Sequence, residues 1–144
     1  MIAPDANLLI YAYAPNDPHH EASRIWLESV LTHSEPVGIP IHLIYAFVRV
    51  VTNPRSTSIP LSFSAAAKIV DSWVELQHVR ILYPGERHWR LIHQLSQSVS
   101  IRGAQLTDAA VAALAIEFGA IVYTNDRDFA RYPGLRWHNP LKPS

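Results

Sequence analysis

The sequence predicts an α/β fold in which helices cover both faces of a central, mainly parallel sheet. Short apolar segments alternate with longer segments of helical periodicity, an order that is typical of parallel sheets. Hydrophobic residues make up 49% of the chain, which is enough to bury a core on both faces of such a sheet. The 144 residues contain no repeat, low-complexity tract or linker, so we expect a single domain over residues 1–144.

Three apolar segments have the composition of buried strands. Residues 120–124 (AIVYT) form the clearest of them, and residues 36–40 (PVGIP) and 79–82 (VRIL) are the other two. Residues 1–4 (MIAP) are also apolar, but this segment is too short to predict a strand by itself.

Six segments combine helical periodicity with helix-capping signals, namely residues 7–14, 16–33, 41–55, 60–77, 85–103 and 106–119. Gly103 and Gly119 are predicted to end the last two helices. The predicted N-terminal caps are, in chain order, Asp5 or Asn7, Asp17, Ser64 and Thr107.

The apolar spacing also predicts which face of each helix is buried. Residues 41–55 have an opposite face that carries His42, Ala46, Arg49 and Asn53. The predicted inward residues are Ala22, Ile25, Trp26, Val30, Ile44, Phe47, Val48, Val51, Ile69, Val70, Trp73, Ile92, Leu95 and Val99.

The composition excludes several classes of protein. The chain has no cysteine, which rules out disulfides, thiolate catalysis and zinc–thiolate sites. Acidic and basic residues balance at 12 each, so the net charge gives no support for non-specific nucleic-acid binding. The N-terminus lacks a basic region of the signal-peptide type, and no apolar run has the length of a membrane span. We therefore expect a cytoplasmic protein without membrane association.

Three aspartates lie where short apolar or connecting segments give way to helices, namely Asp5, Asp108 and Asp126. Ligands of parallel sheets bind beyond the carboxyl ends of the strands, and this architecture would gather the three side chains at that edge. Taken alone, each aspartate is explained more simply as a helix N-cap. Asp128 is likewise explained as a cap or as an ion-pair partner of Arg131 at helical spacing.

Taken together, the aspartates favour a metal site. Converging carboxylates raise one another's pKa unless a cation neutralises them, and Mg²⁺ or Mn²⁺ is the usual solution for all-oxygen ligands. Such an ion orients and activates a water and stabilises charge on a phosphodiester oxygen. The chain contains neither G-x-x-x-x-G-K-[ST] nor G-x-G-x-x-G, so neither phosphate-binding motif competes with this interpretation.

Four blocks of sequence carry a resemblance to a known family, namely DANLLIYAYA (5–14), FVRVVTNPR (47–55), LTDAAVAALAIEFGAIVYTNDRDFARYPGLRW (106–137) and NPL (139–141). The sequence resembles PIN-domain proteins, specifically the VapC-type toxins of bacterial toxin–antitoxin pairs. This resemblance implies a three-layer α/β/α domain and a Mg²⁺- or Mn²⁺-dependent endoribonuclease that cuts structured RNA such as tRNA or rRNA. It also implies an antitoxin partner that occupies or blocks the site, and a homodimer.

The resemblance also assigns roles by position. The family's metal-binding and catalytic acids correspond to Asp5, Asp108 and Asp126, and Asp128 matches an additional catalytic acid beside them. Asn7 and Thr124 match polar residues that line the same site.

The chain departs from the family at one position. Many PIN domains place a Glu on the helix where this chain has YAFVRVV, and that column falls near Ala46 or Phe47, neither of which binds a metal. Glu21 is a candidate replacement, although a solvated first-turn acid is the simpler interpretation. Arg49 and Arg55 are candidate contacts to RNA phosphates.

Two other functions compete with the nuclease. Without the helix carboxylate, the protein is alternatively a PIN-like module that binds RNA or an antitoxin peptide without efficient cleavage. A phosphoryl-transfer receiver or phosphatase shares the parallel sheet and an early Asp, but DANL lacks the second Asp of a D-x-D pair. Metal-dependent cleavage of RNA separates the nuclease from the module that only binds.

Overall fold

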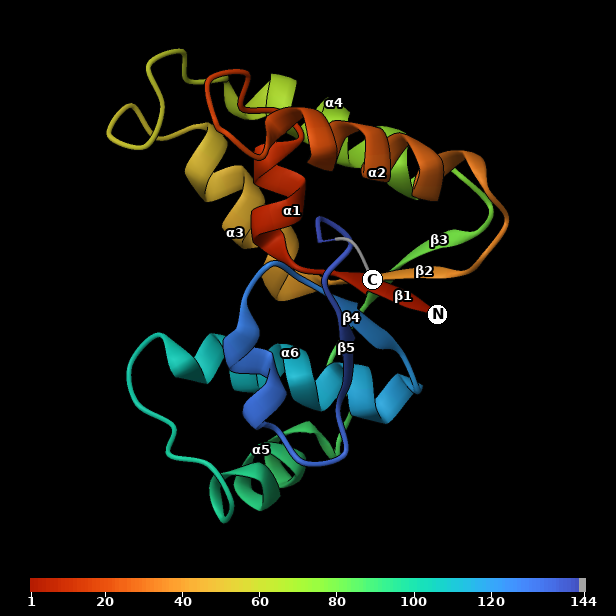
Figure 1. Cartoon of the computed structure of the whole chain (residues 1–144), viewed down its shortest axis with the longest axis vertical. Coiled ribbons are helices and arrows are strands. Elements are labelled where there is room, and N and C mark those ends of the chain that lie inside the picture. The colour runs from red at the N-terminus through yellow and green to blue at the C-terminus, as the bar shows by residue number, and fades with distance from the viewer. Residues whose placement is uncertain (143–144) are drawn as a thin grey trace.

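The computed structural model describes residues 1–142 and has the α/β architecture expected from the sequence (Figure 1). Its helices are α1 (Ala6–Tyr11), α2 (His20–Thr32), α3 (Ile41–Val51), α4 (Phe63–Val74), α5 (His88–Ser96) and α6 (Gln105–Phe118), followed by the 3₁₀ helix η1 (Arg127–Arg131). Its strands are β1 (Ile2–Pro4), β2 (Val37–Pro40), β3 (Val79–Leu82), β4 (Ile121–Tyr123) and β5 (Arg136–His138).

The five strands form one sheet in the order β3-β2-β1-β4-β5, and every neighbouring pair is parallel. The central strand is β1, where Ile2 pairs with Val37 of β2 on one side and with Ile121 of β4 on the other. Parallel pairing brings the carboxyl ends of β1 and β4 to the same edge of the sheet. The predicted parallel sheet is therefore confirmed.

Helices cover both faces of this sheet. In Figure 1, α1 to α4 lie on one side of the sheet, whereas α5 and α6 lie on the other. Each side has its own buried apolar cluster, one centred on Phe47 and Trp73 and the other on the middle of α6. This three-layer arrangement leaves the edge at the carboxyl ends of the strands free of a covering helix layer.

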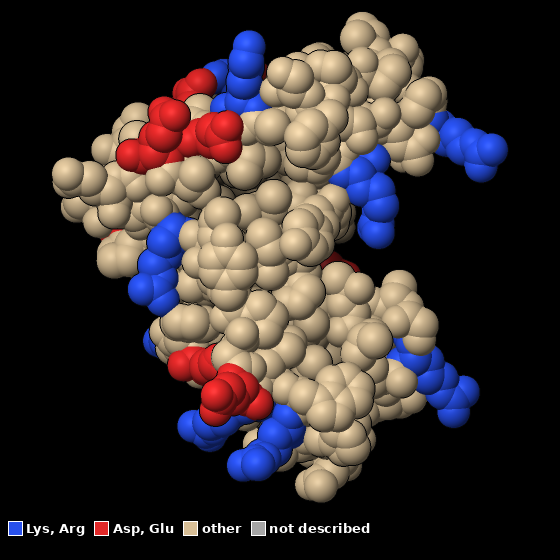
Figure 2. Space-filling model, turned by 180° about the vertical axis from the view of Figure 1, so that it is seen from behind, with Lys and Arg blue, Asp and Glu red and all other residues tan. Residues whose placement is uncertain are grey.

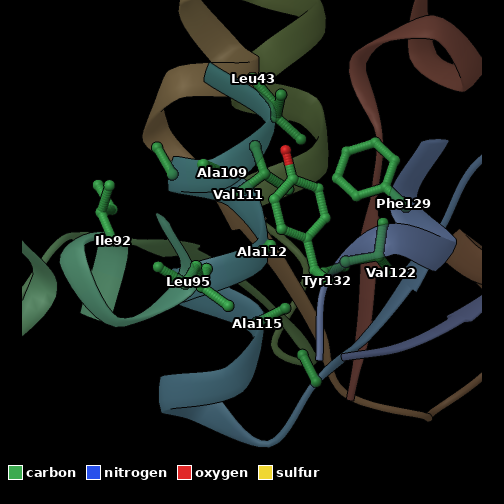
Figure 3. Close-up of a cluster of buried hydrophobic side chains, with 14 of the residues drawn as sticks. Leu43, Ile92, Leu95, Ala109, Val111, Ala112, Ala115, Val122, Phe129 and Tyr132 are labelled. Carbon is green, nitrogen blue, oxygen red and sulfur yellow. The ribbon is translucent and has the colours of Figure 1, made fainter. Parts of the chain in front are cut away.

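The α6 side of the core depends on small residues. All seven residues from Ala109 to Ala115 are buried, and five of them are alanine. Figure 3 shows α6 enclosed by Leu95 of α5 and by Phe129 and Tyr132 of the segment after β4. A helix that is apolar all round must be buried on all sides, and small side chains let its backbone approach its neighbours. This packing fixes the position of Asp108, which immediately precedes the buried run.

The inward face predicted for α3 is largely confirmed, whereas that of α2 is partly wrong. On α3, Phe47 is fully buried and its ring lies 4.9 Å from that of Trp73. On α2, Val30 is buried as expected, but Ile25 is 54% exposed. Ser23 and Leu27 are buried instead, because α2 packs with a different turn toward the sheet.

Several predicted helix ends are also corrected. Asp17 accepts a hydrogen bond from the backbone N–H of His19 at 2.8 Å, so it closes a turn and α2 begins only at His20. Thr107 does not cap α6 but lies inside its first turn, since the N-cap is Ala104. The helix α5 ends at Ser96, and Gly103 lies in the following loop. Ser62, not Ser64, caps α4.

Two strands lack the apolar length that would have predicted them. β1 contains three residues, and β5 contains the partly exposed sequence Arg136–His138. Both are strands because they pair with β4, from opposite sides. None of the helices within residues 1–142 is long and apolar enough to cross a bilayer.

The N-cap of α4 provides a test of the described helix boundaries. The Ser62 hydroxyl accepts a hydrogen bond from the backbone N–H of Ala65 at 3.1 Å. We expect Ser62→Ala to lower the free energy of unfolding by about 1 kcal/mol, because a backbone donor of the first turn loses its partner. Urea unfolding measures the change. The control Ser64→Ala should stay within about 0.5 kcal/mol of the wild type, and the reverse order would restore the original assignment.

Candidate functional site

The aspartates predicted to share a site converge at the carboxyl edge of the sheet. Asp5 directly follows β1, Asp126 follows the neighbouring strand β4, and Asp108 lies in the first turn of α6. Asp5, Asp126 and Asp128 each raise the pKa of Asp108, which shows that the four carboxylates lie within electrostatic reach of one another. Figure 2 shows a recess in one edge of the molecule with acidic surface at its bottom and basic side chains on both sides.

Thr124 joins the two strands at this edge. Its side chain is fully buried, and its hydroxyl donates a hydrogen bond to Asp5 Oδ2 at 2.7 Å. The same hydroxyl accepts a hydrogen bond from the backbone N–H of Asp126 at 2.9 Å. A hydroxyl is the smallest group that donates and accepts at once. Thr124 therefore holds the first and last predicted acids in a fixed relation.

Asp5 is both a helix cap and a buried acid. Its other oxygen, Oδ1, accepts a hydrogen bond from the backbone N–H of Ala6 at 2.8 Å, which makes Asp5 the N-cap of α1. Burial raises the pKa of Asp5, the bonds from Thr124 and Ala6 lower it, and the charge of Asp126 raises it further. Each carboxylate oxygen keeps a free lone pair, so capping and cation binding are compatible.

Asp108 is a half-buried acid whose pKa is raised far above its ordinary value. Burial raises its pKa to about 6, and the charges of Asp5, Asp126 and Asp128 add to this increase. The charge of Arg131 opposes this increase in pKa, and its guanidinium also donates a hydrogen bond to the Ser100 carbonyl at 2.8 Å. Asp108 therefore titrates near neutral pH in the metal-free protein.

Asp126 and Asp128 begin the 3₁₀ helix η1. Asp126 Oδ1 accepts a hydrogen bond from the backbone N–H of Asp128 at 2.9 Å, so Asp126 caps this short helix. Phe129, which follows, is buried in the α6 core. The anchored phenylalanine and the cap together fix the backbone that presents both carboxylates.

The donor set fits a hard divalent cation. All the converging ligands are carboxylate or hydroxyl oxygens, which Mg²⁺ and Mn²⁺ prefer. The two ion pairs found within residues 1–142 join Arg24 to Glu21 and Glu28, so neither neutralises the cluster. In that part of the chain no three acidic or histidine side chains already surround one point as metal ligands. Burial and then the neighbouring carboxylates raise the pKa of Asp108, and a bound cation would oppose both effects by favouring its charged form.

The position of the departure from the family pattern is occupied by core side chains. Phe47 is fully buried against Trp73, and Ala46 packs against the cluster that contains the alanines of α6. Glu21 lies on α2 in an exposed ion pair with Arg24, at 2.7 Å. Within the described residues, the hydrogen bonds and the ion pair of the Glu21 carboxylate all go to Arg24, so nothing joins it to the acidic cluster as a replacement acid.

Three other predicted site residues are exposed. Asn7 lies in the first turn of α1, two positions after Asp5, and takes part in none of the side-chain hydrogen bonds found in residues 1–142. Arg49 lies in the last turn of α3, and Arg55 lies in the loop that follows this helix. Neither arginine forms an ion pair in the described part of the chain, so both are free to meet an external anion.

Two polar groups near the cluster were not identified from the sequence. Tyr11 ends α1, and burial raises its pKa, followed by the charge of Asp17, while Asn125 lowers it and Asp5 and Asp126 raise it further. Asn139, beyond β5, donates a hydrogen bond from Nδ2 to Asn125 Oδ1 at 2.9 Å. The block NPL contains Asn139, but its place beside the site depends on β5, which periodicity did not predict.

Comparison with known proteins places this geometry among relatives. The family model described as "PIN domain" matches residues 2–135. Ribonuclease VapC43 of Mycobacterium tuberculosis is 38% identical over 141 residues, covering 98% of this chain and 96% of that protein. Ribonuclease VapC33 of the same species is 31% identical over 142 residues, covering 99% of each.

Solved structures of low sequence identity share the fold. VapBC-1 from nontypeable Haemophilus influenzae matches with a TM-score of 0.69 and 20% identity, covering 99% of this chain and 100% of that chain. Mycobacterium tuberculosis VapC20, described as a sarcin–ricin loop cleaving toxin, matches with a TM-score of 0.67 and 18% identity, covering 94% and 99%.

Because the pKa of Asp108 is raised, replacing its carboxylate by an amide should stabilise the protein at neutral pH but not at acidic pH. The folded protein holds this proton up to about pH 6, whereas the unfolded chain releases it near 3.8, so the metal-free protein loses stability as the pH rises between these values. We expect Asp108→Asn to raise the free energy of unfolding at pH 7.5 by about 1 kcal/mol, after allowing for solvent screening of a half-buried group. At pH 4 the difference should be close to zero.

Urea unfolding in EDTA at both pH values measures this difference, because urea carries no charge and does not screen the carboxylates. The control Glu75→Gln changes an exposed carboxylate at the end of α4 and should show no comparable pH dependence. An equal effect of Asp108→Asn at the two pH values would contradict the electrostatic explanation.

Proposed function

Since this chain belongs to the PIN domain family and to its VapC ribonuclease branch, we propose that it is a Mg²⁺- or Mn²⁺-dependent endoribonuclease, the toxin of a type II toxin–antitoxin pair. The observation that carries the proposal is the convergence of Asp5, Asp108 and Asp126 at one sheet edge, with Thr124 bonded between two of them. The relatives named as ribonucleases match almost the whole chain, which supports extending their reaction class to it.

In the proposed mechanism, Asp5, Asp108 and Asp126 would hold the cation, directly or through water, and Asp128 would support it or take a proton. The bound ion would activate a water and stabilise charge on the phosphodiester oxygen. Thr124 fixes the relative positions of Asp5 and Asp126, and the hydrogen bond from the Ala6 N–H to Asp5 Oδ1 limits rotation of the Asp5 carboxylate. Because Asp108 holds its proton up to about pH 6, cation binding should strengthen as the pH rises through that value.

The proposed substrate is structured RNA such as tRNA or rRNA. The sarcin–ricin loop named for one structural neighbour is consistent with this class. Asn7 is exposed in the first turn of α1, and Arg49 and Arg55 are exposed on α3 and in the loop after it. Exposed arginines without an ion pair in the described residues suit a polyanion, whose phosphates the guanidinium groups would contact.

An antitoxin protein is the proposed partner, and a homodimer is the proposed assembly. Structural neighbours described as VapBC support the partner. The molecule also exposes large apolar side chains at Tyr45, Ile59 and Phe63. Tyr45 and Phe63 line a groove of about 430 Å³ between α3 and α4, an apolar surface of the kind that a partner chain covers.

One observation favours a weaker activity. Ala46 and Phe47 occupy the position where many PIN domains carry a Glu, so one ligand of a four-acid site is missing. In the alternative function, the protein binds RNA or an antitoxin peptide and cleaves little. Low metal affinity would also make activity depend on Mn²⁺, whose ligand requirements are met with fewer carboxylates when the substrate contributes an oxygen.

Cleavage of total RNA by the purified protein tests the proposed function. We expect discrete fragments in Mg²⁺ or Mn²⁺ and none in EDTA, and we expect Asp126→Asn to reduce the rate at least about 100-fold because a cation ligand loses its charge. Glu75→Gln, an exposed acid on α4, should keep the wild-type rate. The absence of metal-dependent cutting of tRNA and rRNA by folded protein would favour the binding module.

The exposed ion pair of Glu21 leads to a separate expectation. Since Glu21 is paired with Arg24 outside the cluster, Glu21→Gln should change the cleavage rate less than about twofold. Rates are compared with those of Asp126→Asn under the same metal concentrations. An equal loss in both variants would show that Glu21 supplies the missing ligand after all.

A further inference from the structure

We infer that Asn139, in the segment after β5, is a positioning residue that aims Asp126 through Asn125. This inference rests on the proposed function for its catalytic consequence, whereas the geometry and the cation affinity that it concerns are measurable without RNA. The side-chain hydrogen bonds of Asn139 within residues 1–142 go to Asn125 and Leu141, and none goes to the acidic cluster. Asn139 acts indirectly, because its hydrogen bond to Asn125 restrains the backbone that leads to Asp126.

Both ends of the Asn139 amide are engaged. Its Oδ1 accepts a hydrogen bond from the backbone N–H of Leu141 at 2.9 Å, and its Nδ2 donates to Asn125 Oδ1 at 2.9 Å. The backbone N–H of Leu141 is a donor and nothing else, so it fixes which end of the amide is the oxygen. The NH₂ group of Asn139 must therefore face Asn125, and the contact is directional.

Asn125 lies between the two residues that build the site. Thr124 precedes it, and its hydroxyl bridges Asp5 and the backbone of Asp126. The backbone N–H of Thr124 donates to the His138 carbonyl at 2.9 Å, so residues 138 and 139 hold the segment 124–125 by one backbone and one side-chain bond. Asn125 is the link between this anchored point and Asp126.

The same clamp reaches the end of α1. Because Asn125 Oδ1 accepts from Asn139, the NH₂ group of Asn125 is left to face other partners. The Tyr11 hydroxyl lies beside the Asn125 side chain, and Asn125 lowers its pKa, as a donor to the phenol oxygen does. Tyr11 of α1 thus adds a contact to the hydrogen-bonded pair of Asn125 and Asn139.

Removing the hydrogen bonds of the Asn139 side chain should disturb the position of Asp126 more than it lowers the stability of the fold. Asn139 lies outside the apolar core and is only partly buried, so losing its two bonds should lower the melting temperature by only a few degrees. A shift of a reacting group by about 1 Å, in contrast, costs rates of about 100-fold in enzymes generally. A positioning role therefore predicts a loss of kcat out of proportion to the loss of stability.

The test compares Asn139→Ala, Asn125→Ala and the double variant with the wild-type protein. The readouts are kcat and KM for RNA cleavage in Mn²⁺, Mn²⁺ affinity by electron paramagnetic resonance in the absence of RNA, and the melting temperature. We expect each single variant to lose at least about tenfold in kcat with KM within about twofold, and to bind Mn²⁺ several-fold more weakly. The double variant should be no worse than either single one, because both remove the same bond.

Two controls separate positioning from stability. Ser62→Ala loses a helix cap far from the cluster and should lower the melting temperature by a similar few degrees while keeping kcat and Mn²⁺ affinity. Asn139→Asp keeps the acceptor for Leu141, and Asn125 can turn its NH₂ group toward the new carboxylate, so this variant should lose less kcat than Asn139→Ala. Wild-type kcat in Asn125→Ala, with kcat lost in Asn139→Ala, would show that only the turn at Leu141 matters and would overturn the inference.

The outcomes also distinguish this inference from the proposed function. Unchanged kcat and Mn²⁺ affinity in Asn139→Ala, with Asp126→Asn inactive, would overturn the positioning role and leave the nuclease standing. No cleavage by the wild type, with weaker Mn²⁺ binding in Asn139→Ala, would support the positioning role and reject the nuclease. Additive losses in the double variant would show two independent effects and would also overturn the inference.

Discussion

The hydroxyl of Thr124 is the contact on which the acidic edge of this protein depends. It donates to Asp5 and accepts from the backbone of Asp126, and so it joins the ends of β1 and β4 where no further strand pairing is available. Asp5 is only 7% exposed, and a buried carboxylate is tolerated only when donors satisfy it. An apolar residue at position 124 would leave the Asp5 carboxylate with Ala6 N–H as its single donor, and the backbone N–H of Asp126 would lose its acceptor.

The fold accepts an electrostatic cost at this edge and compensates for it elsewhere. Mutual repulsion and burial raise the pKa of Asp108, so the metal-free cluster is less stable than a polar surface of the same size would be. Immediately after Asp108, the buried run Ala109–Ala115 packs closely against the sheet and its neighbours. A rigid apolar support beside an unfavourable cluster of charges is the arrangement expected of a site whose charges serve a ligand.

Periodicity predicted the elements that carry their own apolar signal and missed those that depend on a neighbour. The α3 face with Phe47 and the strand β4 were found because their side chains are apolar at regular spacing. The strands β1 and β5 were missed because pairing with β4, and not composition, makes them strands. Helix starts were misassigned at Asp17 and Thr107 because several residues able to cap lie close together, and the local turn decides among them.

The site was predictable to the extent that topology determines it. Asp5, Asp108 and Asp126 come together because parallel strands end at one edge, and this argument needs no knowledge of side-chain contacts. Thr124 entered through family resemblance, and its buried bridge explains that match in physical terms. Asn139 and Tyr11 meet Asn125 only through the folding of segments that are far apart in sequence. Local sequence patterns therefore do not predict these contacts.

The bond between Thr124 and Asp5 spans 119 residues of sequence, and Thr124 is held in turn by β5. During synthesis, Asp5 therefore leaves the ribosome long before the strands that complete its surroundings. Contacts of such separation form late, because the entropy of closing the loop must be overcome first. The acidic edge is consequently not assembled on a partly synthesised chain. Any activity of this edge begins only after β5 has been translated.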